Sequence, residues 1–350
     1  MTAYGLLSLA DHLPDPVSGQ QTTQAERYAL IIRSAVWAEE AGFEHIGIGE
    51  HHFSNYIAPS PIVMLAAVAA RTTTVRLGTS VTLLASLDPL RVAEDLATLD
   101  IISNGRAEMT FARGVIESNL SAFGITDTND LRPRFEENLR LVLRLLTGEK
   151  VTWSGRYRCP LNDIRLEPRP VQKPHPPIFV GGGLSTVSCD LAADLGLPLT
   201  LPSLFRPPRD YLSIVDRYRE RMMRNGFTDR IAVSYPSYVH VARTSQEARS
   251  RWRPYLEAYV RFATDRRGDF GGSLEFDSLV GGTAICGSPA EVVDRVARTN
   301  EVLGLSTHYL MADLGGLPGA LLQEVLELLG AYVLPGLRGR PHSPAAIQMA

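Results

Sequence analysis

Cysteine is scarce in this sequence. The 350 residues include only Cys159, Cys189 and Cys286, and no two of them are close together in the chain. A disulfide framework needs an even and denser set of cysteines, and a structural zinc site needs cysteines or histidines at short spacings. The sequence therefore predicts neither feature, and it favours a protein of the reducing cytoplasm.

Long apolar runs and a large excess of one charge are missing as well. No 18 consecutive residues are apolar, so no membrane-spanning helix is predicted. The first residues lack the basic segment and the long apolar stretch of a secretory signal. The formal net charge is −3, which gives no sign of the basic surface of a nucleic-acid-binding protein.

A Gly-x-Gly-x-x-Gly motif is absent between the first predicted strand and the first predicted helix, which argues against a doubly wound dinucleotide-binding sheet. Apolar runs typical of strands instead alternate with segments of helical periodicity. The predicted strands are 4–9, 45–49, 75–83, 106–112, 176–180, 197–201, 231–242 and 307–312. The predicted helices are 23–41, 62–71, 89–102, 132–146, 185–195, 209–225, 245–264, 289–304 and 319–333. This order predicts an α/β fold, a (β/α)₈ TIM barrel with insertions, as one domain over residues 1–340.

Two segments interrupt the alternation of strands and helices. Residues 148–177 are rich in proline and are predicted to form a hairpin with an extended lead-in. Residues 265–287 are rich in glycine and are predicted to form a long loop, which is a candidate for a mobile lid. Residues 341–350 are expected to form a disordered C-terminal tail.

The most informative motif follows the second predicted strand, where Glu50, His51 and His52 come directly after Gly49. TIM barrels place catalytic side chains at the carboxyl ends of their strands. A catalytic metal needs about three protein ligands, and no His-x-x-x-His pair or second acidic cluster supplies them, so no metal is predicted. A histidine acting as general acid or base beside a carboxylate is the favoured interpretation. A solvated loop histidine is the alternative.

Arg113 and Gly114 follow the fourth predicted strand. A guanidinium at the barrel mouth can bind a phosphate with two parallel hydrogen bonds, and the glycine lets a ligand or backbone approach closely. A surface salt bridge between Arg113 and Glu117 explains the arginine, taken alone, at least as well.

Residues 181–183 are three glycines, and Ser185 and Thr186 follow them at the start of a predicted helix. Such a turn offers unpaired N–H groups and a partial positive charge to an anion. A tight turn in which Ser185 caps the helix is the structural alternative. Together with Arg113 at the same barrel mouth, the turn suggests a phosphate-bearing cofactor.

Other polar and aromatic residues have a plain structural interpretation. Thr79 and Ser80, in the third predicted strand, can simply fill the barrel. Five aromatic residues are candidates for an apolar substrate pocket, but most are expected to belong to the core. They are Phe53, Tyr56, Phe205, Tyr235 and Tyr238.

Taken in order, the motifs resemble those of the bacterial luciferase-like flavin-dependent monooxygenases. The resemblance is carried by Gly49-Glu50-His51-His52-Phe53 and by Asp88-Pro89-Leu90-Arg91-Val92-Ala93-Glu94-Asp95. Further matching segments are 38–43, 75–79, 99–100, 103–106, 173–178, 181–182 and 287–293. Any one segment is modestly specific, whereas the ordered set, which runs through most of the chain, is strong evidence.

The resemblance implies a TIM barrel that holds a flavin, usually FMN, at its C-terminal mouth. It implies that Arg113 binds the FMN phosphate, that the peptide between Thr79 and Ser80 is cis and lies against the isoalloxazine ring, and that His51 is the acid or base. His52 would shape the pocket, and these two histidines are the predicted catalytic residues. The cofactor-binding residues predicted on this basis are Glu50, Thr79, Ser80, Arg113, Gly182, Gly183, Ser185 and Thr186.

The implied activity is oxygenation of a small organic substrate by reduced FMN and O₂ through a C4a-hydroperoxide. A separate flavin reductase and a homodimer are expected from the family. Ala112 replaces a reactive cysteine of the luciferase α-subunit, so a thiol role and light emission are not implied. Two alternatives stay open: an oxidoreductase that uses the deazaflavin F420 for hydride transfer on the same barrel, and a non-catalytic flavin-binding protein.

Overall fold

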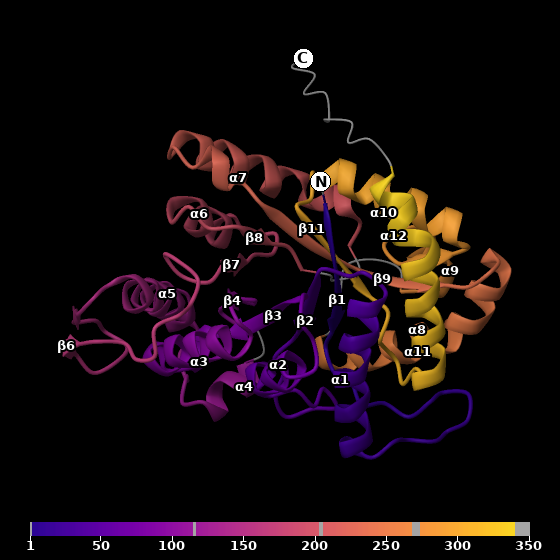
Figure 1. Cartoon of the computed structure of the whole chain (residues 1–350), viewed down its shortest axis with the longest axis horizontal. Helices are drawn as coiled ribbons and strands as arrows, with labels where there is room; N and C mark the ends of the chain where they lie inside the picture. Colours follow the sequence, from indigo (N-terminus) through magenta and orange to yellow (C-terminus); the bar gives the residue numbers. More distant parts are fainter. Residues whose placement is uncertain (1, 115–116, 203–205, 268–273, 340–350) are drawn as a thin grey trace.

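The computed structural model describes residues 2–114, 117–202, 206–267 and 274–339. Eight parallel strands form a closed ring (Figure 1). In ring order they are β1 (Ala3–Ser8), β2 (His45–Ile48), β3 (Arg76–Leu83), β4 (Ala107–Ala112), β7 (Ile178–Gly181), β8 (Leu199–Thr200), β9 (Val233–Val241) and β11 (Thr307–Met311). Pairing of β8 with β9 and of β11 with β1 closes the ring. The predicted TIM barrel is confirmed, and each predicted strand overlaps one strand of the ring.

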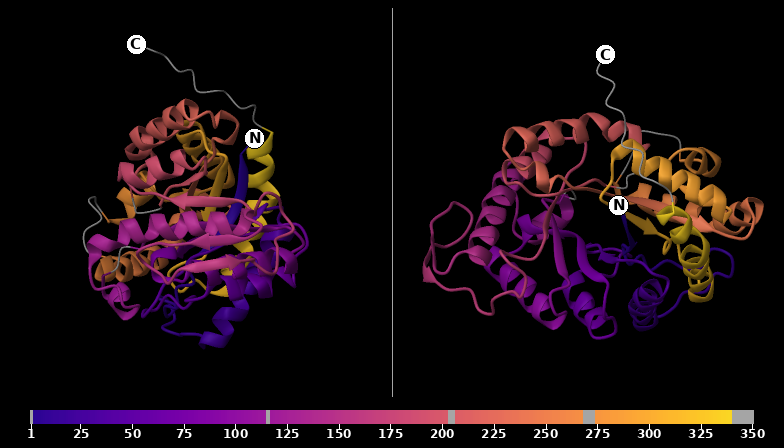
Figure 2. Two further views of the ribbon diagram at one scale, coloured as in Figure 1. Left: turned by 90° about the vertical axis from the view of Figure 1, so that its left-hand side faces the viewer. Right: turned by 45° about the horizontal axis from the view of Figure 1, so that its top comes forward.

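Helices surround the ring on its outer side (Figure 2). They are α1 (Gln24–Glu40), α2 (Pro61–Ala69), α3 (Pro89–Ile102), α4 (Glu117–Ala122), α5 (Leu131–Thr147), α6 (Thr186–Asp194), α7 (Leu212–Arg224), α8 (Ser245–Arg267), α9 (Phe276–Gly281), α10 (Pro289–Leu303), α11 (Gly319–Leu328) and α12 (Leu334–Arg338). Local sequence signals set several of the starts. Thr23 and Glu26 form a reciprocal capping box at α1, and Asp88 caps α3 just before Pro89.

The proline-rich segment forms an antiparallel hairpin of β5 (Val151–Trp153) and β6 (Leu161–Ile164), which extends from one side of the barrel (Figure 1). The glycine-rich segment differs from the prediction of a long loop. Its C-terminal part contains α9 and the short strand β10 (Ile285–Gly287), which pairs with the end of β9. Phe276, Leu279 and Val280 are buried along one face of α9, so helical burial outweighs the local abundance of glycine. Residues 268–273 and the predicted tail lie outside the described residues.

The N-terminal end of the barrel is filled by large side chains packed over glycines. A Cβ atom at Gly5 would lie 2.5 Å from the Tyr309 ring, and one at Gly78 would lie 3.0 Å from Glu108. Glu108 accepts hydrogen bonds from Tyr309 (3.0 Å), from His45 (2.9 Å) and from the guanidinium of Arg76 (2.9 Å). Burial by itself would raise the pKa of Glu108, but His45 and then Arg76 outweigh it and lower the pKa to about 2. This end of the ring is therefore a packed, charge-paired plug.

Within the described residues, the helical run Gly319–Arg338 is long and apolar enough to be a membrane-span candidate by length and composition alone. Its buried side chains include Leu322, Val325 and Leu329, and its first part packs against α1. Core helices share this composition, so the run is weak evidence for a membrane.

Candidate active site

A cavity of about 420 Å³ opens at the C-terminal end of the barrel, within the range of small-molecule sites. All eight barrel strands contribute to its walls, most of them through their C-terminal ends and the residues that follow. The lining residues are Leu7, Leu9, Glu50, His51, His52, Ser80, Val81, Leu83, Ser86, Ala112, Arg113, Gly114, Leu120, Phe123, Gly181, Gly182, Gly183, Leu184, Ser185, Ser188, Thr200, Leu201, Pro202, Pro236 and Met311. Most of the predicted site residues are thus gathered around one space, although they are spread over more than 130 residues of sequence.

Two predicted cofactor-binding residues lie outside the cavity wall. Thr79 is buried in β3, and its hydroxyl donates to the Thr110 carbonyl oxygen at 3.4 Å. It fills the space between strands, as the structural interpretation expected. Thr186 is the first residue of α6 and is exposed. The structure therefore places neither side chain where a ligand in this cavity would meet it.

Each oxygen of the Glu50 carboxylate has a partner in the surrounding structure. One oxygen, Oε1, lies 2.8 Å from Nε2 of His52, and the other accepts the backbone N–H of Leu83 at 3.0 Å. The His52 ring also meets the edge of Phe123, with ring centroids 4.7 Å apart. The carboxylate thus fixes His52 and joins the end of β2 to the end of β3.

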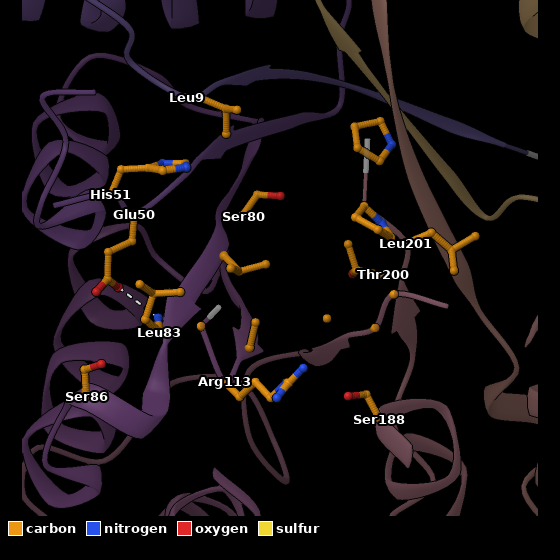
Figure 3. A pocket seen from close by; sticks show the side chains of 18 of the residues that line it. Leu9, Glu50, His51, Ser80, Leu83, Ser86, Arg113, Ser188, Thr200 and Leu201 are labelled. Carbon is orange, nitrogen blue, oxygen red and sulfur yellow. Dashed lines mark hydrogen bonds between the residues drawn. The ribbon is translucent and has the colours of Figure 1, made fainter. Parts of the chain in front are cut away.

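The imidazole of His51 has a different environment. It lines the cavity, and one of its faces is stacked on the Tyr56 ring, with centroids 4.1 Å apart and an angle of 29° between the planes. Figure 3 shows the His51 side chain projecting into the same space as the Arg113 guanidinium, from a different side. His51 and Arg113 are therefore parts of one site.

The peptide between Ser80 and Val81 is cis, so the prediction of a cis peptide between Thr79 and Ser80 is wrong by one residue. Thr79 still belongs to the regular ladder with β4, and the register shifts only between Ser80 and Thr82. The carbonyl oxygen of Ser80 closely approaches Gly49, where a Cβ atom would lie only 2.9 Å away. This contact explains why glycine precedes Glu50 in the motif.

Arg113 lies at the end of β4, beside Gly114, which has a φ of +83°. Among the described residues, the Arg113 guanidinium has no hydrogen-bond or ion-pair partner. The alternative partner Glu117 has its side chain outside the described part of the chain. The positive charge is thus available to an anionic ligand in the cavity.

The turn before α6 forms the neighbouring wall, because β7, which precedes the turn, pairs with β4. Gly182 and Gly183 line the cavity, and Ser185 caps α6 by accepting the N–H of Val187 at 3.4 Å. In Figure 3, Arg113 and Ser188 lie in the same part of the cavity. Ser185 therefore caps α6, as the structural alternative expected. The start of this helix also faces the cavity that Arg113 lines.

Sequence reasoning missed several residues of the wall. Ser86 has a buried hydroxyl with no hydrogen-bond partner among the described residues, and it lines the cavity. Ser188 lies three residues after Ser185, and this helical spacing could have indicated that both face the cavity. Phe123 gives no comparable signal, because its contact with His52 joins distant parts of the sequence.

The five aromatic candidates behave differently from one another. Tyr56, Tyr235 and Tyr238 are buried in the core, as expected for most of the set. Phe53 is 67% exposed and has a φ of +53°, so the core interpretation is wrong for this residue. Phe205 lies outside the described residues.

Comparisons with known proteins cover nearly the whole chain. The 4-hydroxyprotoasukamycin monooxygenase of Streptomyces nodosus subsp. asukaensis is 29% identical over 326 residues, which are 87% of this chain and 85% of that protein. The crystal structure of monooxygenase RslO1 from Streptomyces bottropensis superposes with a TM-score of 0.86 and 29% identity, covering 95% of this chain and 99% of that one.

Several other curated relatives match only in part, and the chain spans about half or less of their length. Two proteins of Sinorhizobium fredii are 35% identical over 42% and 50% of their lengths. The oxygenase component of a flavin-dependent trigonelline monooxygenase from Acinetobacter baylyi is 34% identical over 48% of its length. An F420-dependent glucose-6-phosphate dehydrogenase of Kineococcus radiotolerans is 37% identical over 53% of its length.

The family profile described as luciferase-like monooxygenase matches residues 3–307. The match covers most of the sequence and all but the last residues of the barrel ring. The chain belongs to the luciferase-like monooxygenase family.

Proposed function

We propose that this protein is a flavin-dependent monooxygenase that uses reduced FMN and O₂ to oxygenate a small organic substrate. The observation that carries the proposal is the presence of His51 and Arg113 in the wall of one cavity at the C-terminal mouth of the barrel. A guanidinium suits the phosphate of FMN, and an imidazole suits proton transfer beside the ring system.

The residues on the Arg113 side of the cavity fit a phosphate. The guanidinium is unpaired among the described residues, the buried hydroxyl of Ser86 has no partner there, and α6 begins at this wall. Each supplies a hydrogen-bond donor or a partial positive charge to an anion. We assign phosphate binding to Arg113, with the turn at residues 182–185 assisting.

The rest of the wall suits an apolar substrate and a site with little water. Leu7, Leu9, Leu201 and Met311 line the cavity from three different strands or their ends. When bound there, reduced flavin supplies the electrons that activate O₂. The leucines and the methionine keep water away from the reacting groups, and His51 holds or moves the proton that the reaction requires.

A separate reductase is the proposed source of reduced flavin. The relative from Acinetobacter baylyi is named as an oxygenase component, a name that fits an enzyme of two parts. Homodimer formation and a cytoplasmic location are further parts of the proposal, which rest on the family resemblance and on the scarcity of cysteine.

Hydride transfer with F420 is the second candidate, favoured by the likeness to an F420-dependent dehydrogenase over half the chain. The two candidates differ in cofactor and in their need for O₂. We therefore propose anaerobic titration of the purified protein with reduced FMN and with reduced F420, followed by exposure to isotopically labelled dioxygen with a panel of neutral organic compounds. Binding of FMN with label in an organic product supports the monooxygenase, whereas binding of F420 alone with product formed without O₂ overturns it.

A further inference from the structure

We propose that Tyr56, held in place by Tyr259, is a positioning residue that fixes the orientation of the His51 imidazole. The inference rests on the proposed role of His51 in proton transfer and adds the contacts that orient its ring. Nothing in the sequence around His51 points to α8, on which Tyr259 lies.

The first step is the contact between the two rings. The imidazole of His51 and the ring of Tyr56 are stacked with centroids 4.1 Å apart. His51 lines the cavity, whereas Tyr56 does not. The tyrosine ring therefore covers the face of the imidazole that is turned away from the ligand space, and its position limits how far the imidazole can rotate.

The second step is the hydrogen bond that holds the tyrosine. The hydroxyl oxygens of Tyr56 and Tyr259 are 3.0 Å apart, and the hydroxyl of Tyr238 donates to that of Tyr259 at 3.5 Å. Tyr259 is 2% exposed. Burial, with the neighbouring tyrosines second, raises the pKa of Tyr259 well above its usual value, so this group stays a neutral hydroxyl and orients its neighbour by hydrogen bonding.

The backbone on either side of Tyr56 is held as well. The N–H of Ile57 donates to the Ala10 carbonyl oxygen at 2.9 Å, and the N–H of His12 donates to the Asn55 carbonyl oxygen at 2.6 Å. The Tyr28 hydroxyl donates to the Ile57 carbonyl oxygen. Tyr56 therefore sits on a backbone bridge between the segment after β1 and the segment after β2.

That bridge is anchored in a buried charged group. The side chain of Arg27 donates two hydrogen bonds of 2.9 Å to the carboxylate of Asp313, and its Nε donates to the carbonyl oxygen of Asp11 at 2.7 Å. The carboxylate of Asp11 accepts the N–H of Gly315 at 2.8 Å. The backbone near Tyr56 is fixed in this way, and its ring packs against Phe262, with centroids 4.8 Å apart, while its hydroxyl contacts that of Tyr259.

The test replaces Tyr259 with phenylalanine, which removes the hydroxyl and keeps the ring. In protein with nitrogen-labelled histidine, the NMR signals of His51 are identified by their loss in His51→Gln. We expect Tyr259→Phe to change the chemical shifts of the ring nitrogens of His51 and to lower kcat about threefold, as the loss of about one hydrogen bond would. The affinity for FMN should change less than about twofold.

Tyr211→Phe is the matched control, because Tyr211 is also buried and its hydroxyl has no partner among the described residues. It should leave the signals of His51 unchanged. Tyr56→Phe is the second test variant. It keeps the stacking on His51 and removes the other hydroxyl of the Tyr56–Tyr259 contact, so it should reproduce the effect of Tyr259→Phe. Unchanged His51 signals in both test variants, or an equal change in Tyr211→Phe, would overturn the proposal.

The NMR result does not depend on turnover. If the wild-type protein oxygenates nothing but its His51 signals respond to Tyr259→Phe, the proposed function fails and the coupling between the two residues stands. If the wild type oxygenates a substrate and the signals do not respond, the positioning role fails and the proposed function stands.

Discussion

Nε2 of His52 lies 2.8 Å from Oε1 of Glu50, and the second oxygen of that carboxylate accepts the backbone N–H of Leu83. The adjacent histidines of the motif therefore have different environments. His52 belongs to a hydrogen-bonded connection between two strand ends, whereas His51 is stacked on Tyr56 at the cavity wall. A carboxylate next to two histidines in sequence does not show which of them it serves, and here it serves His52.

The two histidines should respond differently to substitution. His51→Gln removes the proposed acid or base, so product formed per molecule of reduced FMN oxidised should fall by about 10²-fold or more, with FMN binding changed little. The measurement is product yield against hydrogen peroxide yield in single turnovers. His52→Gln disturbs the partner of Glu50, so it should lower the free energy of unfolding by about 1–2 kcal/mol. Full product yield from His51→Gln would rule out the assigned role.

Arg113→Gln should weaken FMN binding by about 10- to 100-fold, because a charged hydrogen bond to phosphate is lost. Riboflavin lacks the phosphate, so its affinity should not change. Fluorescence titration with both flavins measures the difference directly. Arg140→Gln, at an exposed arginine of α5 paired with Glu136, is the control. If Arg113→Gln weakens both flavins equally, the arginine does not act on the phosphate.

Gly49→Ala should destabilise the protein, because a Cβ atom there would lie 2.6 Å from Leu9 and 2.9 Å from the Ser80 carbonyl oxygen. Overpacking of this kind costs about 1–3 kcal/mol. Gly281→Ala is the control, since a Cβ atom at that position meets nothing within 4 Å. Denaturant unfolding of the two variants compares them. Equal free energies of unfolding for Gly49→Ala and the wild type would contradict this, because they would mean that a methyl group fits at the end of β2.

Acid should destabilise the fold through two buried histidines. Burial lowers the pKa of His240 and of His308 to about 3, with a smaller effect of Arg251 on His240. At pH values between the ordinary histidine pKa near 6.5 and this lowered pKa, each imidazole is protonated in the unfolded chain but neutral in the folded chain. The free energy of unfolding should therefore fall with pH below 6.5, by up to about 1.4 kcal/mol per pH unit for each imidazole.

His240→Phe separates this contribution from the rest. His240 is stacked on Trp252, and neither of its ring nitrogens has a hydrogen-bond partner among the described residues, so a phenyl ring can take its place. The variant should be at least as stable as the wild type at pH 7, and its stability should fall less steeply between pH 6.5 and pH 4. Denaturation curves at several pH values give the slopes, and an unchanged slope would show that His240 binds a proton in the folded state.

Much of the barrel could be predicted from the sequence because each strand is a short apolar run between helix signals. Caps such as Thr23 and Asp88 are local, and they set helix starts wherever the chain folds. The helix α9 could have been found from the spacing of Phe276, Leu279 and Val280. The high glycine content of the surrounding segment outweighed that pattern in the prediction.

Contacts between distant residues account for what the sequence could not show. The hydroxyl contact between Tyr56 and Tyr259 joins positions 203 residues apart, and no periodicity connects them. The plug of Glu108, His45 and Arg76 likewise depends on the register of three strands. The resemblance implied a cis peptide one residue before Ser80–Val81, where the structure has it, and the register shift that adjoins this peptide depends on the pairing of β3 with β4.

The central claim is that the cavity bounded by His51 and Arg113 holds FMN for a reaction with O₂. The most direct measurement is anaerobic titration of the wild-type protein with reduced FMN in competition with reduced F420. The account predicts that one FMN binds per chain, that F420 does not displace it at equal concentration, and that O₂ is then consumed. Tighter binding of F420, or binding of neither cofactor, would contradict it.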